Sequence, residues 1–260
     1  MNSKNGTRVA LVTGGGKGIG EAVAYALARQ GLRVAVAART QADVARVTAA
    51  IRERGGDALA VVCDVTQPVS IAAAIARVRD DLGAITILVN NAGASASAKF
   101  LGHDDALWHQ MIEANLNSTY YVTKAIAPMM VEANWGRIIN IASIAAKVGG
   151  KYIAAYTAAK HGVLGLTRAL AVELVAHNIT VNAICPGYVD TLMTDRSVAN
   201  IVARTKMAEG DARAALEKTS PQNRLITPEE VAAVAVMLVG DDARGITGQA
   251  INVDGGAVQF

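Results

Sequence analysis

Short apolar runs of strand type alternate with longer stretches of helical pattern along almost the whole chain, and no other feature restricts the fold as strongly. Strands are expected at Arg8–Thr13, Arg33–Ala38, Ala58–Cys63, Ile85–Asn90, Arg137–Ala142, Thr180–Cys185 and Gln249–Val253. Helices are expected at Gly20–Gln30, Gln41–Arg54, Val69–Leu82, Asp105–Glu132, Ala154–Ala176 and 228–239. A helix that connects two parallel strands makes a right-handed crossover, and a series of such units builds a parallel sheet with helices on both faces. The pattern therefore predicts an α/β fold over residues 1–260, a single doubly wound parallel-sheet domain of Rossmann type.

Two places depart from this rhythm. Pro128 is expected to bend or end part of the long helix Asp105–Glu132. Residues 187–222 are polar and contain no clear strand, with a helix expected around Ala203–Glu217. A long polar insertion after the sixth strand, where an open sheet binds its ligand, is typical of a lid.

Composition narrows the class of protein. Hydrophobic residues make up 52% of the 260 residues and charged residues 18%, which excludes a disordered chain. A formal net charge of +3 does not indicate nucleic acid or an anionic membrane as partner. Cys63 and Cys185 are too few for a disulfide framework, Met1–Gly6 lacks the pattern of a signal peptide, and no apolar run approaches the ~18 residues of a membrane helix. A cytoplasmic protein is therefore expected.

The loop between the first strand and the first helix has the sequence TGGGKGIG, from Thr13 to Gly20. It is not a P-loop, because Gly18 and not a hydroxyl residue follows Lys17. Glycines let the main chain approach a pyrophosphate closely, and the helix N-terminus offers free N–H groups. The alternative is a glycine-rich turn without a ligand, but the position between a first strand and a helix favours dinucleotide binding.

This loop resembles the pattern of the short-chain dehydrogenase/reductase family, and the resemblance extends from about Arg8 to Gly256. Further matching motifs follow in the family's order: Asp64-Val65, Asn90-Asn91-Ala92-Gly93 and Pro186-Gly187. Asn115, Ser143, Tyr156 and Lys160 fall where the family has its catalytic tetrad. The resemblance implies a nicotinamide-dependent oxidoreductase, usually a homotetramer. It also implies that Lys160 holds the nicotinamide ribose and that Asn115 positions a water between Lys160 and solvent.

The catalytic pattern Tyr-x-x-x-Lys occurs twice, as Tyr120/Lys124 and Tyr156/Lys160. Helical periodicity does not separate the two pairs, since each lysine lies one turn from its tyrosine. The context favours Tyr156, which follows Ser143 by 13 residues, as in the family, whereas Tyr120 lies within a long helix. We expect Tyr120 and Lys124 to form a surface or subunit contact.

The reaction expected of this set is reduction of a carbonyl group. Tyr156 would donate the proton, and the charge of Lys160 would lower its pKa from the ordinary value of about 10. Ser143 would orient the carbonyl oxygen by a hydrogen bond. The four histidines, His103, His109, His161 and His177, lack metal-ligand spacing, so no metal is expected.

The second strand ends in Ala38-Arg39 without the acidic residue that usually binds the ribose of NAD. Arg39, with Lys17, would instead bind the 2′-phosphate of NADP(H), unless both are ordinary surface cations. The complete set of expected cofactor-binding residues is Gly14, Gly16, Lys17, Gly18, Ile19, Gly20, Arg39, Asp64, Val65, Asn91, Ala92, Gly93, Tyr156, Lys160, Pro186, Gly187, Val189 and Thr191.

The substrate is expected against the nicotinamide, walled by Ser143, Val148, Ile153, Tyr188 and Met193. The stretches His161–Leu174 and Ile179–Met193 most resemble reductases of 3-oxoacyl thioesters, particularly polyketide ketoreductases, which implies an acyl-carrier protein or CoA as carrier. A dehydrogenase of a free secondary alcohol, cyclic alcohol or steroid, with NAD a possible cofactor, is the second interpretation. A non-catalytic dinucleotide-binding scaffold is the third, and the intact tetrad disfavours it.

Overall fold

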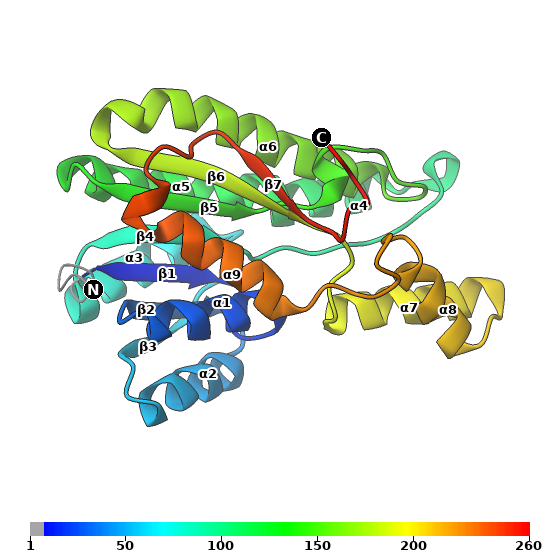
Figure 1. The fold of residues 1–260 in the computed structure, drawn as a ribbon, viewed down its shortest axis with the longest axis horizontal. Helices are drawn as coiled ribbons and strands as arrows, with labels where there is room; N and C mark the ends of the chain where they lie inside the picture. The colour runs from blue at the N-terminus through cyan, green and yellow to red at the C-terminus, as the bar shows by residue number, and fades with distance from the viewer. Residues whose placement is uncertain (1–7) are drawn as a thin grey trace.

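The computed structural model describes residues 8–260, so Met1–Gly6, to which the signal-peptide argument refers, lies outside the described residues. These residues form a seven-stranded sheet in the order β3-β2-β1-β4-β5-β6-β7, in which every neighbouring pair is parallel (Figure 1). The strands are β1 (Val9–Thr13), β2 (Arg33–Ala38), β3 (Ala58–Val62), β4 (Ile85–Asn90), β5 (Gly136–Ile141), β6 (Ile179–Pro186) and β7 (Ala250–Val253).

Central strands of this sheet are apolar on both faces because helices cover both. Every residue of β1, β5 and β6 is buried, as expected for a parallel sheet between two helical layers. The strand order reverses between β1 and β4, and ligands of doubly wound sheets bind at this point, beyond the carboxyl ends of the strands. The predicted fold class is confirmed.

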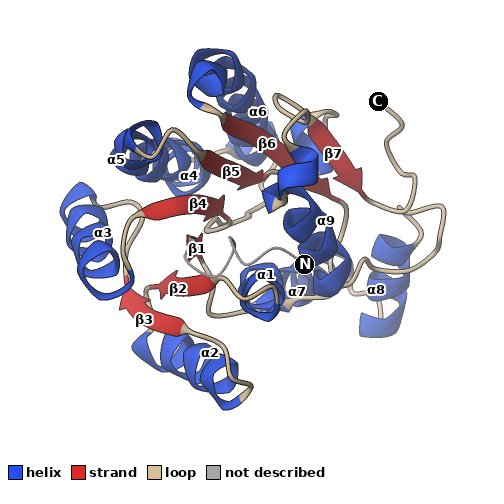
Figure 2. Ribbon diagram, turned by 60° about the vertical axis from the view of Figure 1, so that its left-hand side comes forward, coloured by secondary structure: helices blue, strands red, loops and turns tan. Residues whose placement is uncertain are grey.

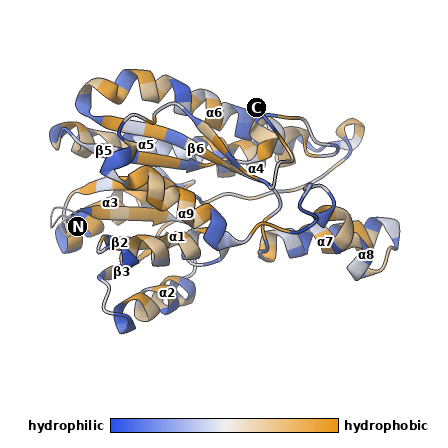
Figure 3. Ribbon diagram, viewed as in Figure 1, coloured by the Kyte–Doolittle hydropathy of each residue, from blue (hydrophilic) through white to orange (hydrophobic). Residues whose placement is uncertain are grey.

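Two helical layers enclose the sheet (Figure 2). One layer contains α1 (Gly18–Arg29), α2 (Gln41–Glu53) and α9 (Pro228–Val239), which pack with the strands in one apolar core. The other layer packs in a second core on the opposite face and contains α3 (Pro68–Leu82), α5 (Ser118–Glu132) and α6 (Ala154–Leu174). Figure 3 shows the apolar colouring concentrated in the strands and on the helices beside them.

The long helix predicted at Asp105–Glu132 is not regular. It consists of α4 (Asp105–Ile112), a π-helical turn (Glu113–Asn117) and α5, and Pro128 lies inside α5 without ending it. Of the two effects expected of Pro128, bending the helix or ending it, the second is therefore wrong. The interruption lies instead at Asn115, whose side chain is drawn into contacts with the loop after β4.

The segment after β6 contains two helices, α7 (Leu192–Thr205) and α8 (Glu209–Glu217), where one helix at Ala203–Glu217 was predicted. Lys206 adopts a left-handed conformation with φ of 63°, which ends α7 and separates it from α8. Figure 1 shows this pair extending away from the body of the sheet. Within residues 8–260, no helix combines the length and the apolar character needed to span a membrane.

Candidate active site

A cavity of about 350 Å³ opens at the carboxyl ends of β4, β5 and β6. Its walls come from the loop after β4, the residues around Ser143, the first turns of α6, and the β6–α7 connection. Fifteen of the residues expected to bind cofactor or substrate, or to act in catalysis, line it: Ile19, Asn91, Gly93, Asn115, Ser143, Val148, Ile153, Tyr156, Lys160, Pro186, Gly187, Tyr188, Val189, Thr191 and Met193. Residues from distant parts of the sequence thus converge on one space.

The four expected catalytic side chains are all among these lining residues. Ser143 lies two residues after the end of β5, and its Oγ accepts a hydrogen bond of 3.1 Å from the Ala145 N–H. Tyr156 lies in the first turn of α6, and Lys160 follows one turn later, with its Nζ 5.7 Å from the centre of the Tyr156 ring. The helix therefore presents both residues toward the end of β5.

Asn115 is held in the π-helical turn by three hydrogen bonds. Its Nδ2 donates to the carbonyl oxygens of Met111 and Ala94, each over 2.9 Å, and its Oδ1 accepts from the Ala94 N–H at 3.2 Å. A Cβ at Gly93 would lie 2.7 Å from Asn115 Oδ1, so glycine is required where this loop meets the turn. These contacts hold Asn115 in the wall of the cavity that Lys160 also lines.

Burial determines the protonation of Tyr156 and Lys160. It raises the pKa of Tyr156 to about 12, although a hydrogen bond with Ser143 acts in the opposite direction. It lowers the pKa of Lys160 to about 8. The structure contradicts the expectation that Lys160 lowers the pKa of Tyr156, because desolvation dominates and the lysine hydrogen-bonds the Ile141 carbonyl oxygen at 2.8 Å.

The glycine loop is tied to the loop after β4. Thr13 Oγ1 accepts hydrogen bonds from the N–H groups of Asn91 and Ala92 at 3.0 and 3.1 Å, and Asn91 Nδ2 donates to the Thr13 and Gly14 carbonyl oxygens. A Cβ at Gly14, where φ is 62°, would lie 2.9 Å from Ala92 Cα. No side chain caps the N-terminus of α1, whose N–H groups can therefore bind a phosphate.

The residues expected at the adenosine end lie outside the main cavity. Ala92 and Val65 line a second, smaller cavity with Thr13. Arg39 is exposed after β2, and its charge contributes to a lowered pKa of Asp64, whose Oδ1 accepts two hydrogen bonds from Thr66. Lys17 is not free, because its Nζ lies 3.0 Å from Asp43 Oδ2, an acidic partner that the sequence analysis did not consider.

Comparison with protein families decides the classification. The family model described as enoyl-(acyl carrier protein) reductase matches residues 14–258, from the glycine loop to the end of the sheet. The chain belongs to the short-chain dehydrogenase/reductase family. Its members are oxidoreductases that bind a nicotinamide dinucleotide.

Relatives within the short-chain dehydrogenase/reductase family cover nearly the whole chain. A Streptomyces virginiae protein named for the ketoacyl reductase of the monensin polyketide synthase is 43% identical over 98% of each chain. A 3beta-hydroxysteroid dehydrogenase of Mediterraneibacter gnavus is 39% identical, over 97% of this chain and 95% of its own. The crystal structure of a variant of the actinorhodin polyketide ketoreductase with NADPH superposes with a TM-score of 0.95, at 37% identity and with 100% of both chains covered.

The second Tyr-x-x-x-Lys pair of this short-chain dehydrogenase/reductase lies elsewhere. Tyr120 on α5 is 43% exposed, and its hydroxyl accepts a hydrogen bond of 3.2 Å from Lys124 Nζ. Neither residue lines the main cavity. Among residues 8–260, no three His, Cys, Asp or Glu side chains lie close enough together to hold a metal ion.

Several polar residues of the cavity wall were not identified from the sequence. Ser95, Ser197 and Thr219 line it, from the loop after β4, from α7 and from the residues after α8. The serine-rich stretch Ala94–Ala98 signalled only a loop, and Ser197 lies in a part of α7 that the sequence analysis did not assign. Because no helix was predicted there, the direction in which the Ser197 side chain points could not be inferred.

Proposed function

We propose that this protein is an NADP(H)-dependent ketoreductase that reduces the ketone of a 3-oxoacyl thioester or polyketide chain to the 3-hydroxy product. The observation that carries the proposal is the convergence of Asn115, Ser143, Tyr156 and Lys160 on one cavity. Such a set has no function in a non-catalytic scaffold. The balanced reaction consumes ketone, NADPH and one proton, and yields the alcohol and NADP⁺.

Tyr156 is the proton donor in this proposal. With its pKa raised to about 12, the phenol stays protonated at neutral pH and donates from Oη to the carbonyl oxygen as charge develops there. Ser143 hydrogen-bonds the same oxygen and fixes its direction relative to Tyr156. Lys160 returns a proton to Tyr156 and binds the nicotinamide ribose, and Asn115 positions the water through which Lys160 exchanges protons with solvent.

The cofactor site fits the residues present. The N-terminus of α1, where the N-cap residue Lys17 makes no side-chain capping bond, would hold the pyrophosphate. Glycines at positions 14, 16, 18 and 20 let this loop pack closely, since a Cβ there would contact Ala92, Asp43, Thr191 and the Gly14 carbonyl group respectively. Arg39 would bind the 2′-phosphate, joined by Lys17 when it leaves Asp43. The chemistry that NADPH supplies when bound is hydride donation to the carbonyl carbon.

The substrate side of the cavity is apolar. Val148, Ile153 and Met193 provide a wall suited to an acyl chain, and Ser143 and Tyr156 provide the polar end. We propose residues 187–222, which contain α7 and α8, as the lid of this catalytic domain. The carrier of the acyl chain would be CoA or an acyl-carrier protein.

One observation favours a second candidate. The same apolar wall would suit a cyclic alcohol or steroid, and a relative at 39% identity is named a 3beta-hydroxysteroid dehydrogenase. In that case the protein would act on a free secondary alcohol, and NAD could replace NADP.

A substrate panel separates the candidates. NADPH consumption, followed by absorbance, is measured with 3-oxoacyl-CoA and 3-oxoacyl-pantetheine thioesters, with plain cyclic ketones and with 3-ketosteroids. The ketoreductase proposal predicts the highest kcat/KM for a thioester. A preference for steroid or cyclic ketones would select the second candidate, and no turnover with any ketone by a protein that binds NADPH would favour the scaffold.

A further inference from the structure

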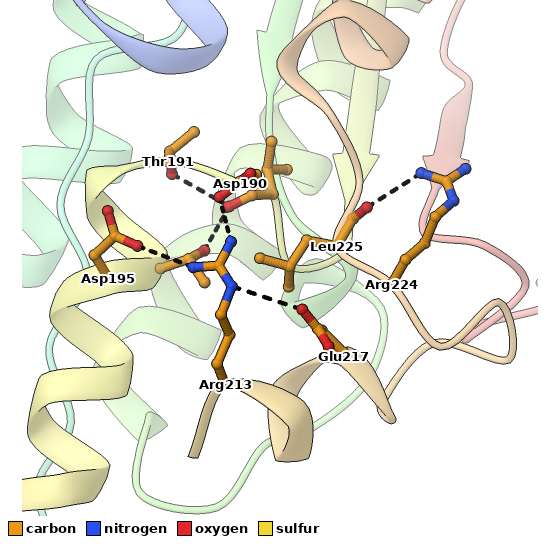
Figure 4. A network of polar contacts seen from close by, with 9 residues as sticks. Asp190, Thr191, Asp195, Arg213, Glu217, Arg224 and Leu225 are labelled. Carbon is orange, nitrogen blue, oxygen red and sulfur yellow. Dashed lines mark hydrogen bonds and ion pairs between the residues drawn. The ribbon is translucent and has the colours of Figure 1, made fainter. Parts of the chain in front are cut away.

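One arginine of the β6–α9 connection contacts three carboxylates at once (Figure 4). Arg213, on α8, places Nη2 2.6 Å from Asp190 Oδ1 and Nη1 3.3 Å from Asp195 Oδ1, and its Nε lies 3.6 Å from Glu217 Oε1. Asp190 precedes α7, Asp195 lies in its first turn and Glu217 ends α8. The guanidinium therefore joins both helices to the end of β6.

The three carboxylates alternate along the chain with residues that line the cavity. Asp190 lies between Val189 and Thr191, and Asp195 directly follows Thr194, all three neighbours being part of the wall. Glu217 precedes another lining residue, Thr219, by two positions. The wall and the ion pairs thus occupy adjacent positions on the same short segments, so a displacement of one moves the other.

The wall is firmly held on the β6 side. The Ile226 N–H donates to the Tyr188 carbonyl oxygen at 2.9 Å, the Asp190 N–H donates to the Ile226 carbonyl oxygen at 2.8 Å, and Thr194 Oγ1 donates to the Val189 carbonyl oxygen at 2.6 Å. The first two bonds and the isolated β-bridge between Val189 and Ile226 anchor the segment from Tyr188 to Asp190 onto the loop that leads to α9, and the third ties Thr194 to this segment.

Outward from this anchor, the apolar packing between α7 and α8 is one small cluster. Its buried members are Val198, Ala212, Leu216 and Leu225, and Ile201 and Val202 pack against them. Segments with few buried apolar side chains have low local stability, so polar contacts have a large influence on their position. Without Arg213, the three carboxylates would also repel one another, which favours separation of α7 from α8.

We infer that Arg213 is a positioning residue that holds α7 and α8 over the cavity and thereby sets its affinity for the ketone. The link to the ketone rests on the proposed function, whereas the holding of α7 and α8 does not. Arg213 does not touch the reacting atoms, so its loss acts on substrate binding and leaves the proton-transfer step unchanged.

Kinetics of Arg213→Ala provide the first test. With saturating NADPH, KM for the ketone should rise about tenfold, on the scale of several lost ion pairs and new repulsion, while kcat stays within about twofold. The pH profile and the affinity for 2′,5′-ADP, which probes the adenosine end, should not change. Arg213→Lys retains the positive charge but loses the planar guanidinium that contacts several carboxylates at once, so it should give an intermediate KM. A fall in kcat with unchanged KM would overturn the inference.

Arg224 supplies the matched control. It is an exposed arginine of the same connection, it donates to the Leu225 carbonyl oxygen at 3.1 Å (Figure 4), and it is bonded to Glu230 through two nitrogens at 2.7 Å. It does not line the cavity. Arg224→Ala should lower Tm without raising KM. An equal rise in KM in both variants would show a general loss of stability and would contradict the specific role of Arg213.

Hydrogen exchange keeps the inference testable without turnover. In Arg213→Ala, amides of residues 192–217 should exchange faster than in the wild type and in Arg224→Ala, while α1 and α9 stay unchanged. If no ketone is reduced, the proposed function fails, and this measurement still decides the role of Arg213. Unchanged exchange in 192–217 would overturn the inference even in an active enzyme.

Discussion

The ammonium group of Lys160 donates a hydrogen bond of 2.8 Å to the main-chain carbonyl oxygen of Ile141, the last residue of β5. Ser143 follows two residues later, so this bond fixes α6 against the strand end that leads to Ser143. An ammonium group has three N–H donors, and one bond to Ile141 leaves two for the cavity. The contact therefore orients Lys160 for the proposed reaction without occupying it fully.

The low pKa of Lys160 predicts a descending limb in the pH profile of ketone reduction. Burial lowers this pKa to about 8, so the lysine carries its proton below that pH and loses it above. Since Tyr156, with its pKa raised to about 12, stays protonated in this range, kcat/KM should be flat below about pH 8 and fall above it. A profile of initial rates from about pH 6 to 10 checks this. A rate that stays flat to the alkaline end would contradict the role of Lys160 in returning the proton.

Arg39 and Lys17 should determine the choice between NADPH and NADH. Charge-assisted hydrogen bonds contribute about 1.5–3 kcal/mol each, so Arg39→Ala combined with Lys17→Ala should reduce the preference for NADPH by roughly 10²-fold or more. Arg39→Ala alone should have the larger single effect, since Lys17 must first leave Asp43. The ratio of kcat/KM for the two cofactors is the measurement, with Arg54→Ala, an exposed arginine just beyond the other end of α2, as control. The assignment is wrong if the wild type prefers NADH.

A buried chain of hydrogen bonds behind the cavity predicts a specific loss of stability. Asn90 Nδ2 donates to Asn140 Oδ1, and Asn140 Nδ2 donates to Thr167 Oγ1, each over 2.9 Å. Thr167→Val would leave a buried amide donor unsatisfied, which costs about 1–3 kcal/mol. Tm measured by calorimetry should fall by several degrees, whereas Thr167→Ser, which keeps the hydroxyl, should change it less. Equal Tm values for the two variants would show that this bond is unimportant.

Elements buried on both faces were predictable from the sequence. The bounds expected for β2 and β4 coincide with the structure, because continuous apolar runs between turns leave little freedom. The start of α9 was predictable for a local reason. Thr227 and Glu230 form a capping box at its N-terminus, and the Thr-x-x-Glu spacing of such a box is visible in the sequence.

Features that depend on tertiary contacts were not predictable. The π-helical turn at Asn115 exists because Ala94, from a distant loop, bonds to the Asn115 side chain. The spacing of apolar residues in the surrounding helix gives no indication of this π-helical turn. Similarly, α7 buries only Thr194 and Val198 within a polar segment, and the bond from Lys160 to Ile141 depends on how α6 lies against β5. The sequence thus identified the four expected catalytic residues, but not how their side chains are oriented or which further residues join them.

Exposed apolar side chains on the outer helices are consistent with the expected homotetramer. Trp108 on α4, Tyr120 on α5 and Val172 on α6 are 39%, 43% and 79% exposed. Burying such residues between subunits would stabilise an assembly. Sedimentation velocity at micromolar concentration should show a tetramer, and Val172→Glu should dissociate it. A stable monomer in the wild type would contradict this expectation.

The central claim is that Tyr156 donates the proton to the substrate, and its direct test is the turnover of Tyr156→Phe. Because this substitution removes the hydroxyl group that donates the proton, kcat for NADPH-dependent ketone reduction should fall by about 10²-fold or more. The affinity for NADPH should change little. Tyr120→Phe removes the same group from the exposed second pair and should keep full activity. Near-normal turnover of Tyr156→Phe, measured beside that control, would contradict the account.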